Sequence, residues 1–193
     1  SMIMHKTLLR TPHSLVEFFE RPDANSLAFI FNNIVENNPS RDRGPSKLLI
    51  DLGFNVIRFT SQSLDWHQNV PIEFLHQLRS RVDQLNATKR IAIGHSMGAF
   101  ASIALSNFFS VDTCVAFAPQ FNPSAFPDYR FEYGLNNVAT WRYIIDRNSI
   151  SGQCNYYLLY DDQDRDNLHA MKIRELIPHK KYNQITLPYA THE

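Results

Sequence analysis

The sequence is poor in cysteine and glycine, and it has no excess of charge of either sign. Its 193 residues include two Cys and six Gly, and 19 Lys and Arg residues balance 19 Asp and Glu residues. Cys114 and Cys154 form no CxxC pair and make neither a disulfide framework nor a zinc site, so we expect two reduced thiols in the core. A net charge of zero argues against electrostatic binding of nucleic acid, because domains of that kind are usually basic.

Long apolar runs and the common cofactor motifs are also absent. No stretch approaches the ~18 uninterrupted apolar residues that a membrane span needs, and residues 1–6 lack the apolar region of a signal peptide. Neither G-x-G-x-x-G nor a P-loop occurs, which argues against a nicotinamide or nucleotide cofactor. We therefore expect a cytoplasmic protein that binds no membrane, no metal and no organic cofactor.

The composition that remains is that of an ordinary globular protein. Hydrophobic residues make up 44% of the chain and charged residues 20%, which argues against disorder. At ~150 residues per domain, the length predicts a single domain over residues 1–193. Residues 119–150 show several aromatic residues and no clear period, so we expect a small irregular insertion there, with a short helix near 139–145.

Short apolar runs alternate along the chain with segments of helical period. The clearest helix spans 71–86, where Leu75, Leu78, Val82 and Leu85 form one stripe. This alternation predicts an α/β fold with a mostly parallel, doubly wound sheet of about six to seven strands and helices on both faces. Further helices are expected at 46–53, 97–109 and 167–177, strands at 26–32, 55–60, 90–94, 113–118, 155–160 and 182–187, and a strand or a short helix at 14–20.

The most informative motif is Gly94-His95-Ser96-Met97-Gly98, which fits the pattern G-x-S-x-G. The pattern is short and common, but here a β run leads in and a helical segment leads out, as a nucleophile elbow requires. Such a turn strains the serine backbone, and the glycines give neighbouring backbones room to pass. Ser96 is therefore the candidate nucleophile, and the Met97 N–H is a candidate donor to an oxyanion. An ordinary βα turn without chemistry is the alternative.

Two later segments supply the partners that a serine nucleophile needs, a base and a carboxylate that orients it. Carboxylates cluster directly after the expected strand 155–160, and His192 follows the expected strand 182–187. This gives the chain order Ser, acid, His and makes His192 the candidate base. The other histidines lie within the elbow, within or after the helix that follows the acids, or before the nucleophile: His95, His169, His179, His5, His13, His67 and His76.

With these motifs, the chain resembles a small member of the α/β-hydrolase superfamily over residues 26–192. The GHSMG form of the elbow is typical of esterases and lipases in that family. Family members often have a glycine three residues before the acid, and Asp161 stands at that glycine position. The resemblance therefore implies Asp164 as the acid, with Asp162 as the runner-up and Asp161 or Asp166 behind them.

A second oxyanion donor is expected in the loop after the first core strand, at 31–35. Many family members carry His-Gly or a run of glycines there, whereas this chain has Asn32-Asn33. Asn tolerates unusual backbone dihedrals better than most residues, so the loop can still turn sharply. The backbone N–H of Asn33 or of Ile34 is the candidate donor. An Asn pair that merely ends a strand fits the sequence equally well.

Two side chains are candidates for a substrate pocket. Trp66 follows the expected strand 55–60 at the edge of the sheet where sites collect. It would offer a stacking face to a sugar or another flat ligand, or it would pack within its loop. Arg130, in the insertion, would bind a substrate carboxylate, unless it is simply an exposed arginine.

Three hypotheses for the function follow from these residues. The leading one is a serine esterase-type hydrolase that cleaves an ester or thioester of a small soluble substrate through an acyl-enzyme on Ser96. The second is an acyltransferase with the same triad, for instance one with a carbohydrate acceptor. The third is a non-catalytic binding protein with an α/β-hydrolase fold, which the Asn pair and the late position of His192 motivate.

Overall fold

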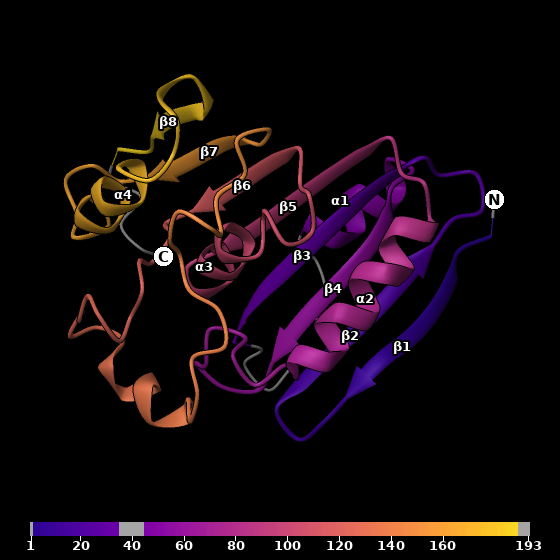
Figure 1. Cartoon of the computed structure of the whole chain (residues 1–193), viewed down its shortest axis with the longest axis horizontal. Helices are drawn as coiled ribbons and strands as arrows, with labels where there is room; N and C mark the ends of the chain where they lie inside the picture. Colours follow the sequence, from indigo (N-terminus) through magenta and orange to yellow (C-terminus); the bar gives the residue numbers. More distant parts are fainter. Residues whose placement is uncertain (1, 35–44, 189–193) are drawn as a thin grey trace.

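The computed structural model describes residues 2–34 and 45–188, and one eight-stranded sheet forms its centre. The strands are β1 (Met4–Arg10), β2 (Ser14–Glu20), β3 (Ser26–Ile34), β4 (Asn55–Ser61), β5 (Lys89–His95), β6 (Thr113–Phe117), β7 (Asn155–Tyr160) and β8 (Tyr182–Thr186). They lie in the order β1-β2-β4-β3-β5-β6-β7-β8 (Figure 1). β2 is antiparallel to both β1 and β4, and all other neighbours are parallel.

The six strands expected between residues 26 and 187 are all present, each within two residues of its predicted ends. Residues 14–20, for which the sequence left a strand or a short helix open, form strand β2, in which Val16 and Phe18 are buried in the core. β1 was not predicted, and it brings the sheet to eight strands instead of six or seven. None of the residues of β1 is buried. An edge strand without a buried face lacks the alternation of apolar and polar residues by which a strand is predicted from sequence.

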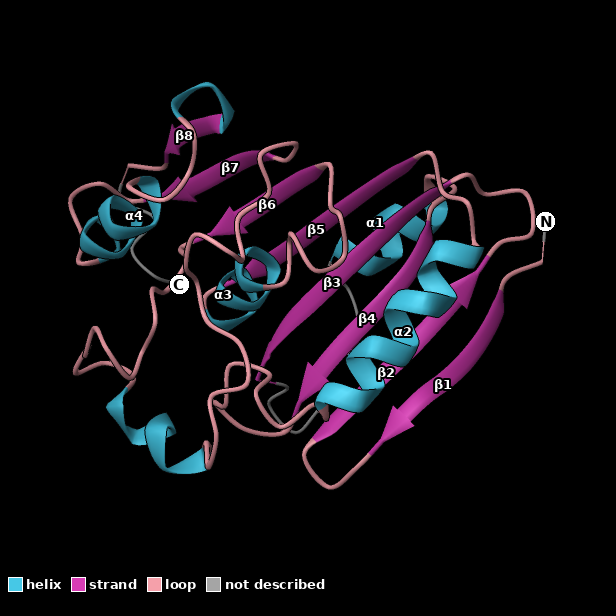
Figure 2. Cartoon of the chain, in the orientation of Figure 1, coloured by secondary structure: helices cyan, strands magenta, loops and turns pink. Residues whose placement is uncertain are grey.

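In the described residues, four α-helices cover both faces of the sheet, as the doubly wound prediction requires. They are α1 (Pro45–Asp51), α2 (Ile72–Gln84), α3 (Met97–Ala104) and α4 (Asp166–Arg174). The apolar residues of α2, α3 and α4 belong to one large core on one face. Leu49 of α1 packs with Ala28 and Val56 on the opposite face. Figure 2 shows α2 and α3 in front of the sheet and α1 behind it.

Two helix predictions differ from the structure. α3 ends at Ala104, short of residue 109, and the hydroxyl of Ser106 bonds the Ile103 carbonyl in the turns that follow. The short helix expected near 139–145 does not form. The Arg142 N–H bonds the Gln68 side chain at 2.7 Å and the Ile145 N–H bonds the Asn122 side chain at 2.8 Å, so these backbone groups serve long-range contacts instead of a helix. The helical turn of this segment is the 3₁₀ helix η1 (Glu132–Asn137).

Both cysteines lie in the core as free thiols, as the sequence predicts. Cys114 is in β6 and Cys154 directly precedes β7. Burial raises the pKa of the Cys114 thiol and raises that of Cys154 to about 12, so neither is a reactive thiolate near neutral pH. Within the described ranges, no helix has the length and apolar character to cross a membrane.

Candidate active site

Strained backbone gathers where the parallel strands end. Four non-glycine residues with positive φ follow the carboxyl ends of β4, β5 and β6: Trp66, His67, Ser96 and Ala118. Their φ values lie between 45° and 58°. Such conformations cost about 1–3 kcal/mol each and persist where the surroundings enforce them, often at functional sites. Segment 119–150 leaves β6 at the same edge (Figure 1). This edge is therefore the candidate active site.

Ser96 occupies the turn between β5 and α3, with φ 57° and ψ −115°. Its N–H donates to the Phe117 carbonyl at 2.8 Å, and its carbonyl accepts the Phe100 N–H at 3.0 Å, so both backbone groups are fixed. A Cβ at Gly94 would lie 2.2 Å from the backbone of Gly98. Only a residue without Cβ allows the strand and the helix to close this tightly. The strand–turn–helix setting expected of the motif is present.

The first turn of α3 lies directly against the end of β3. A Cβ at Gly98 would lie 2.0 Å from the carbonyl oxygen of Phe31. Met97 is the first residue of α3. The first N–H groups of a helix have no acceptor within the helix, and they lie at its positive end. The Met97 N–H therefore belongs to the positive end of α3, directly after Ser96, and its role as an oxyanion donor stays a prediction.

The second predicted donor lies in an irregular part of β3 and not in a loop after it. The pairing of β3 with β4 shifts register between Phe31 and Ile34, as at a bulge that redirects the backbone. The Nε2 of His67 lies 2.8 Å from the Asn32 carbonyl oxygen. Because a trans peptide points its N–H away from its carbonyl, this contact also fixes the direction of the Asn33 N–H.

The Ser96 hydroxyl contacts a side chain that the motifs did not indicate. The Nε2 of Gln120 lies 2.6 Å from Ser96 Oγ, and the Oε1 of Gln120 lies 2.5 Å from the indole nitrogen of Trp66. Trp66 and Gln120 are almost fully buried. The chain turns at Ala118, with φ 45°, two residues before Gln120. The carboxyl ends of β4, β5 and β6 are thereby joined through side chains.

Trp66 does not present an open stacking face. Its side chain is fully buried, and its ring centroid lies 5.5 Å from that of Trp141. The indole N–H is occupied by Gln120. The idea that Trp66 stacks on a sugar is therefore replaced by its alternative, packing within the loop, because no face of the ring reaches solvent.

Arg130, the other candidate for the substrate pocket, forms ion pairs within the protein. Its guanidinium contacts three carboxylates of the protein: Asp128 at 2.7 Å, Asp166 at 2.9 Å and Asp164 at 3.5 Å. These neighbours neutralise its charge and occupy its donors. Through these contacts Arg130 holds the insertion against the start of α4, and binding of a substrate carboxylate by Arg130 stays a prediction.

The candidate acids differ in burial and in partners. Asp161 directly follows β7, is 4% exposed and accepts the Gln163 N–H at 2.9 Å. Asp164 is 26% exposed, and it contacts Arg130 and accepts the Arg165 N–H at 2.7 Å. The Asp162 carboxylate accepts a hydrogen bond from the neighbouring Gln163 side chain at 3.2 Å. Asp166 is 1% exposed, but it is the first residue of α4 and contacts Arg130, so Asp161 is the buried carboxylate that directly follows β7.

His192, the candidate base, lies outside the described residues, as does Val35 at the end of the expected loop 31–35. Among the described histidines, His169 is close to the site but has both ring nitrogens engaged. Its Nδ1 accepts the Phe121 N–H at 2.9 Å, and its Nε2 lies 2.8 Å from Asp128. Because Nδ1 faces a fixed donor, the ring is neutral and donates from Nε2. It anchors the insertion and is not a free base.

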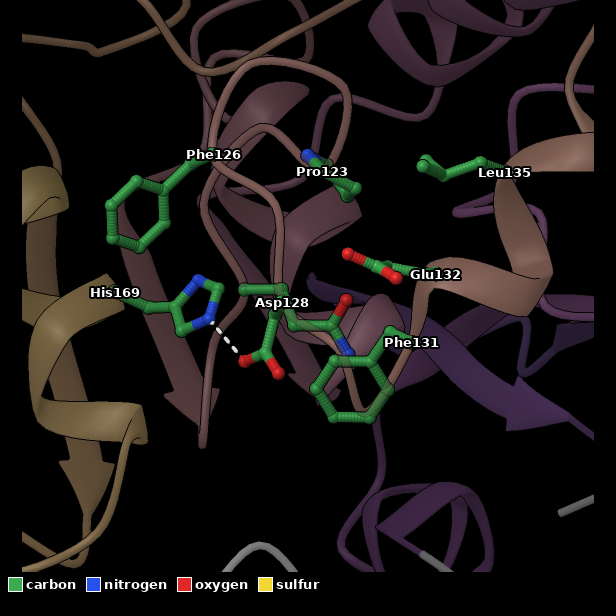
Figure 3. Close-up of a pocket in the computed structure, with 8 residues that line it drawn as sticks. Pro123, Phe126, Asp128, Phe131, Glu132, Leu135 and His169 are labelled. Carbon is green, nitrogen blue, oxygen red and sulfur yellow. Dashed lines mark hydrogen bonds and ion pairs between the residues drawn. The ribbon is translucent and has the colours of Figure 1, made fainter.

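A pocket opens beside Gln120, between the insertion and α4. It has an empty volume of about 220 Å³, part of it open to solvent. Figure 3 shows His169 and Asp128 joined at its floor, with the rings of Phe126 and Phe131 beside them and the carboxylate of Glu132 opposite. Pro123 and Leu135 complete the lining. Ser96 does not line this pocket, and Gln120, which does, is the side chain that connects the two.

Two ionisable groups of the pocket have shifted pKa values. Burial lowers the pKa of His169, although the Asp128 carboxylate opposes the shift. Burial alone would raise the pKa of Asp128, but hydrogen bonds from Arg130 and His169 outweigh it and hold this pKa below its usual value. Near neutral pH the pair is thus a neutral imidazole and a carboxylate. In the part of the chain that the structure describes, no three His, Cys, Asp or Glu side chains are grouped to hold a metal ion.

Comparisons with known proteins agree with this architecture. No family model matches the sequence, and no significant match to a curated protein is found. Among solved structures, the esterase domain of a Rhodothermus marinus protein superposes with a TM-score of 0.64 at 16% identity, over 99% of this chain and 89% of that one. The protein has the α/β-hydrolase fold.

Other structures with the α/β-hydrolase fold are similar to a comparable degree. An α/β-hydrolase enzyme from a Medee basin deep-sea metagenome library gives a TM-score of 0.63 at 13% identity, over 100% of this chain and 83% of that one. A Xanthomonas campestris serine hydrolase described as lacking a lid gives 0.55 at 15% identity, over 98% of this chain and 85% of that one. At such identities the likeness establishes the fold alone.

Within this α/β-hydrolase fold, two side chains of the candidate site belong to none of the motifs in the sequence. Gln120 contacts the candidate nucleophile, and His67 contacts the backbone that precedes a candidate oxyanion donor. Their positions in the sequence were the one available signal, because both residues follow strands whose carboxyl ends lie at the candidate active site. His67 was considered only as a base, and Gln120 lay in a segment without a recognisable pattern.

Proposed function

We propose that the protein is a serine hydrolase that cleaves an ester or thioester of a small soluble substrate. The observation that carries the proposal is the geometry of Ser96, a strained residue at the start of α3 whose hydroxyl is hydrogen-bonded beside a pocket. Strain of this kind is retained where it serves a site. The esterase and hydrolase neighbours support the same reading.

The proposed reaction passes through an acyl-enzyme. Ser96 Oγ attacks the acyl carbon while His192 accepts the hydroxyl proton, and a carboxylate holds the resulting imidazolium. The Met97 N–H and the backbone N–H of Asn33 or Ile34 bind the oxyanion. His192 then protonates the leaving group, and water attacks the acyl-enzyme to release the acid and free Ser96. The chemistry needs only protein groups and water.

For the carboxylate, we propose Asp161 in preference to Asp164. A carboxylate stabilises an imidazolium more strongly in a buried position, because the effective dielectric constant is lower there than at the surface. Asp161 is buried directly after β7, whereas Asp164 is partly exposed and contacts Arg130. Asp164, which the family pattern favours, is the competing assignment.

The size of the pocket favours a substrate whose acyl or alcohol part is short. It is small, and Phe126 and Phe131 supply apolar walls while Asp128 and Glu132 add negative charge. The insertion is tied to the segment after β4 by Arg142, whose N–H bonds the Gln68 side chain at 2.7 Å and whose guanidinium bonds the Gln68 carbonyl at 2.8 Å. A fixed, small cover favours a soluble substrate over a long lipid chain.

The test is hydrolysis of p-nitrophenyl acetate, butyrate and octanoate by the full chain and four variants. We expect activity on the two short esters, its loss in Ser96→Ala and His192→Ala, and a fall in kcat of about 10³–10⁴-fold in Asp161→Asn, because the base loses its orienting carboxylate. The matched variant Asp164→Asn should change kcat by less than about tenfold.

Three outcomes would contradict parts of this proposal. No hydrolysis by the folded wild type would sink the hydrolase assignment. Activity that persists in Ser96→Ala would reject the nucleophile. If Asp164→Asn loses activity and Asp161→Asn keeps it, the acid is Asp164.

A further inference from the structure

We propose that Gln120 is a positioning residue for the nucleophile. It is held by the indole N–H of Trp66, donates a hydrogen bond to Ser96 Oγ and so turns the hydroxyl proton away from itself and toward the base. The inference rests on the proposed function, because it concerns how the same serine is prepared for attack. Neither the elbow motif nor the triad requires a side-chain donor at this place.

The indole of Trp66 decides which way the Gln120 amide faces. A tryptophan Nε1–H is a donor only, so the Gln120 atom 2.5 Å from it must be the carbonyl oxygen. The amide nitrogen then faces Ser96 Oγ at 2.6 Å as a donor. A flipped amide would set two N–H groups against each other at Trp66. The Ser96 oxygen therefore accepts.

The side chains of Trp66, Gln120 and Ser96 are held in place by their buried surroundings. The exposed fractions of Trp66, Gln120 and Ser96 are 0%, 1% and 7%. The Trp66 ring packs against Trp141, which in turn packs edge-on against Phe100 of α3. Since buried side chains in such contacts have few alternative rotamers, the donor is in place before substrate arrives.

The chemical benefit appears as the reaction proceeds. With Gln120 donating to its oxygen, the Ser96 hydroxyl must direct its hydrogen elsewhere, and the base is the acceptor that the reaction needs. As the proton leaves, Oγ gains negative charge and the bond from Gln120 becomes charge-assisted, roughly twice as strong as a neutral one. Because the contact strengthens toward the transition state, it raises kcat more than it lowers KM.

The experiment measures the rate of labelling by a fluorophosphonate probe, and kcat and KM for p-nitrophenyl acetate, in two variants of the full chain. Gln120→Glu keeps the shape but replaces the donor with an acceptor, and Gln120→Met keeps the length without any donor. We expect both to lose about 10- to 100-fold in labelling rate and kcat, with KM nearly unchanged.

The pH dependence separates positioning from a structural role. In Gln120→Glu, burial and the nearby carboxylates of Asp128 and Glu132 raise the pKa of the new carboxyl group. When this group is protonated, it again donates to Ser96. The labelling rate relative to wild type should therefore rise as the pH falls below about 6 for Gln120→Glu and stay flat for Gln120→Met.

Asn122→Leu is the matched control. It removes another buried amide from the same segment, one whose side chain bonds the backbone of Ile145 within the insertion. It should lower thermal stability but leave the labelling rate of the folded protein within about twofold, because it does not touch Ser96.

The outcomes distinguish this inference from the proposed function. If wild type labels at Ser96 and folded Gln120→Met labels as fast, the inference is wrong while the hydrolase proposal stands. A constant ratio of Gln120→Glu to wild type across pH also rejects it. If the folded wild type does not label at all, the proposed function itself fails. Should Gln120→Glu not fold, Gln120→Met and Trp66→Phe, which frees the amide to flip, carry the same comparison.

Discussion

Buried polar side chains around Ser96 each hold one particular atom in place. Gln120 holds the serine oxygen, His67 holds the Asn32 carbonyl and His169 holds the Phe121 N–H. Each contact also satisfies a polar group that would otherwise be costly to bury. At the scale of single residues, these hydrogen bonds therefore fix the orientation of the polar groups around Ser96.

Two of these residues make stability depend on pH. Burial lowers the pKa of His67 and of His169 from the ordinary value of 6.5, although Asp65 and Asp128 oppose the shift. Between the folded and unfolded pKa values the unfolded chain binds more protons than the folded one. The free energy of unfolding should therefore be highest above pH ~6.5 and fall below it, by up to about 1.4 kcal/mol per pH unit for each group.

The measurement is urea unfolding of wild type and His169→Gln from pH 7.5 to 5. Glutamine can accept from Phe121 and donate to Asp128 but does not titrate. The variant should lose less stability than wild type over this range. Equal slopes in both proteins would show that His169 is not held neutral in the folded state.

At the scale of elements, the close approach of α3 to β3 sets the geometry of the candidate oxyanion site. Gly98 has no room for a side chain because of the Phe31 carbonyl. We expect Gly98→Ala to push α3 away from β3, to lower the free energy of unfolding by about 1–3 kcal/mol and to reduce kcat up to about 100-fold through the displaced Met97 N–H.

The control for this prediction is Gly152→Ala, since a Cβ at Gly152 would meet no atom within 4 Å. Calorimetry and ester hydrolysis should show the control to be close to wild type. If Gly98→Ala matches Gly152→Ala in melting temperature, the contact between α3 and β3 is not as tight as the structure indicates.

The elements were largely predictable because their signals are local. The apolar stripe of α2 and the apolar run of β7 lie in continuous segments, and both elements form where the sequence indicates. The 139–145 helix failed because Arg142 and Ile145 direct their N–H groups to Gln68 and Asn122, far away in the chain. No local pattern reports contacts of that kind.

At the scale of the molecule, the parallel sheet gathers distant residues at one edge. Ser96 was predictable, because its turn, its glycines and its flanking elements are contiguous in sequence. Trp66 and Gln120 stand 54 positions apart, and their contact depends on the strand order of the whole sheet. For the same reason the sequence left the choice between an open and a packed Trp66 undecided and gave no sign of the carboxylates around Arg130.

The central claim is that Ser96 is a nucleophile, and covalent labelling tests it most directly. The folded full chain is incubated with a fluorophosphonate, and the adduct is measured by intact mass and located by peptide mapping. We predict one adduct per chain, on Ser96, and none in folded Ser96→Ala. A folded wild-type protein that forms no adduct, or an adduct that persists in Ser96→Ala, would contradict the account.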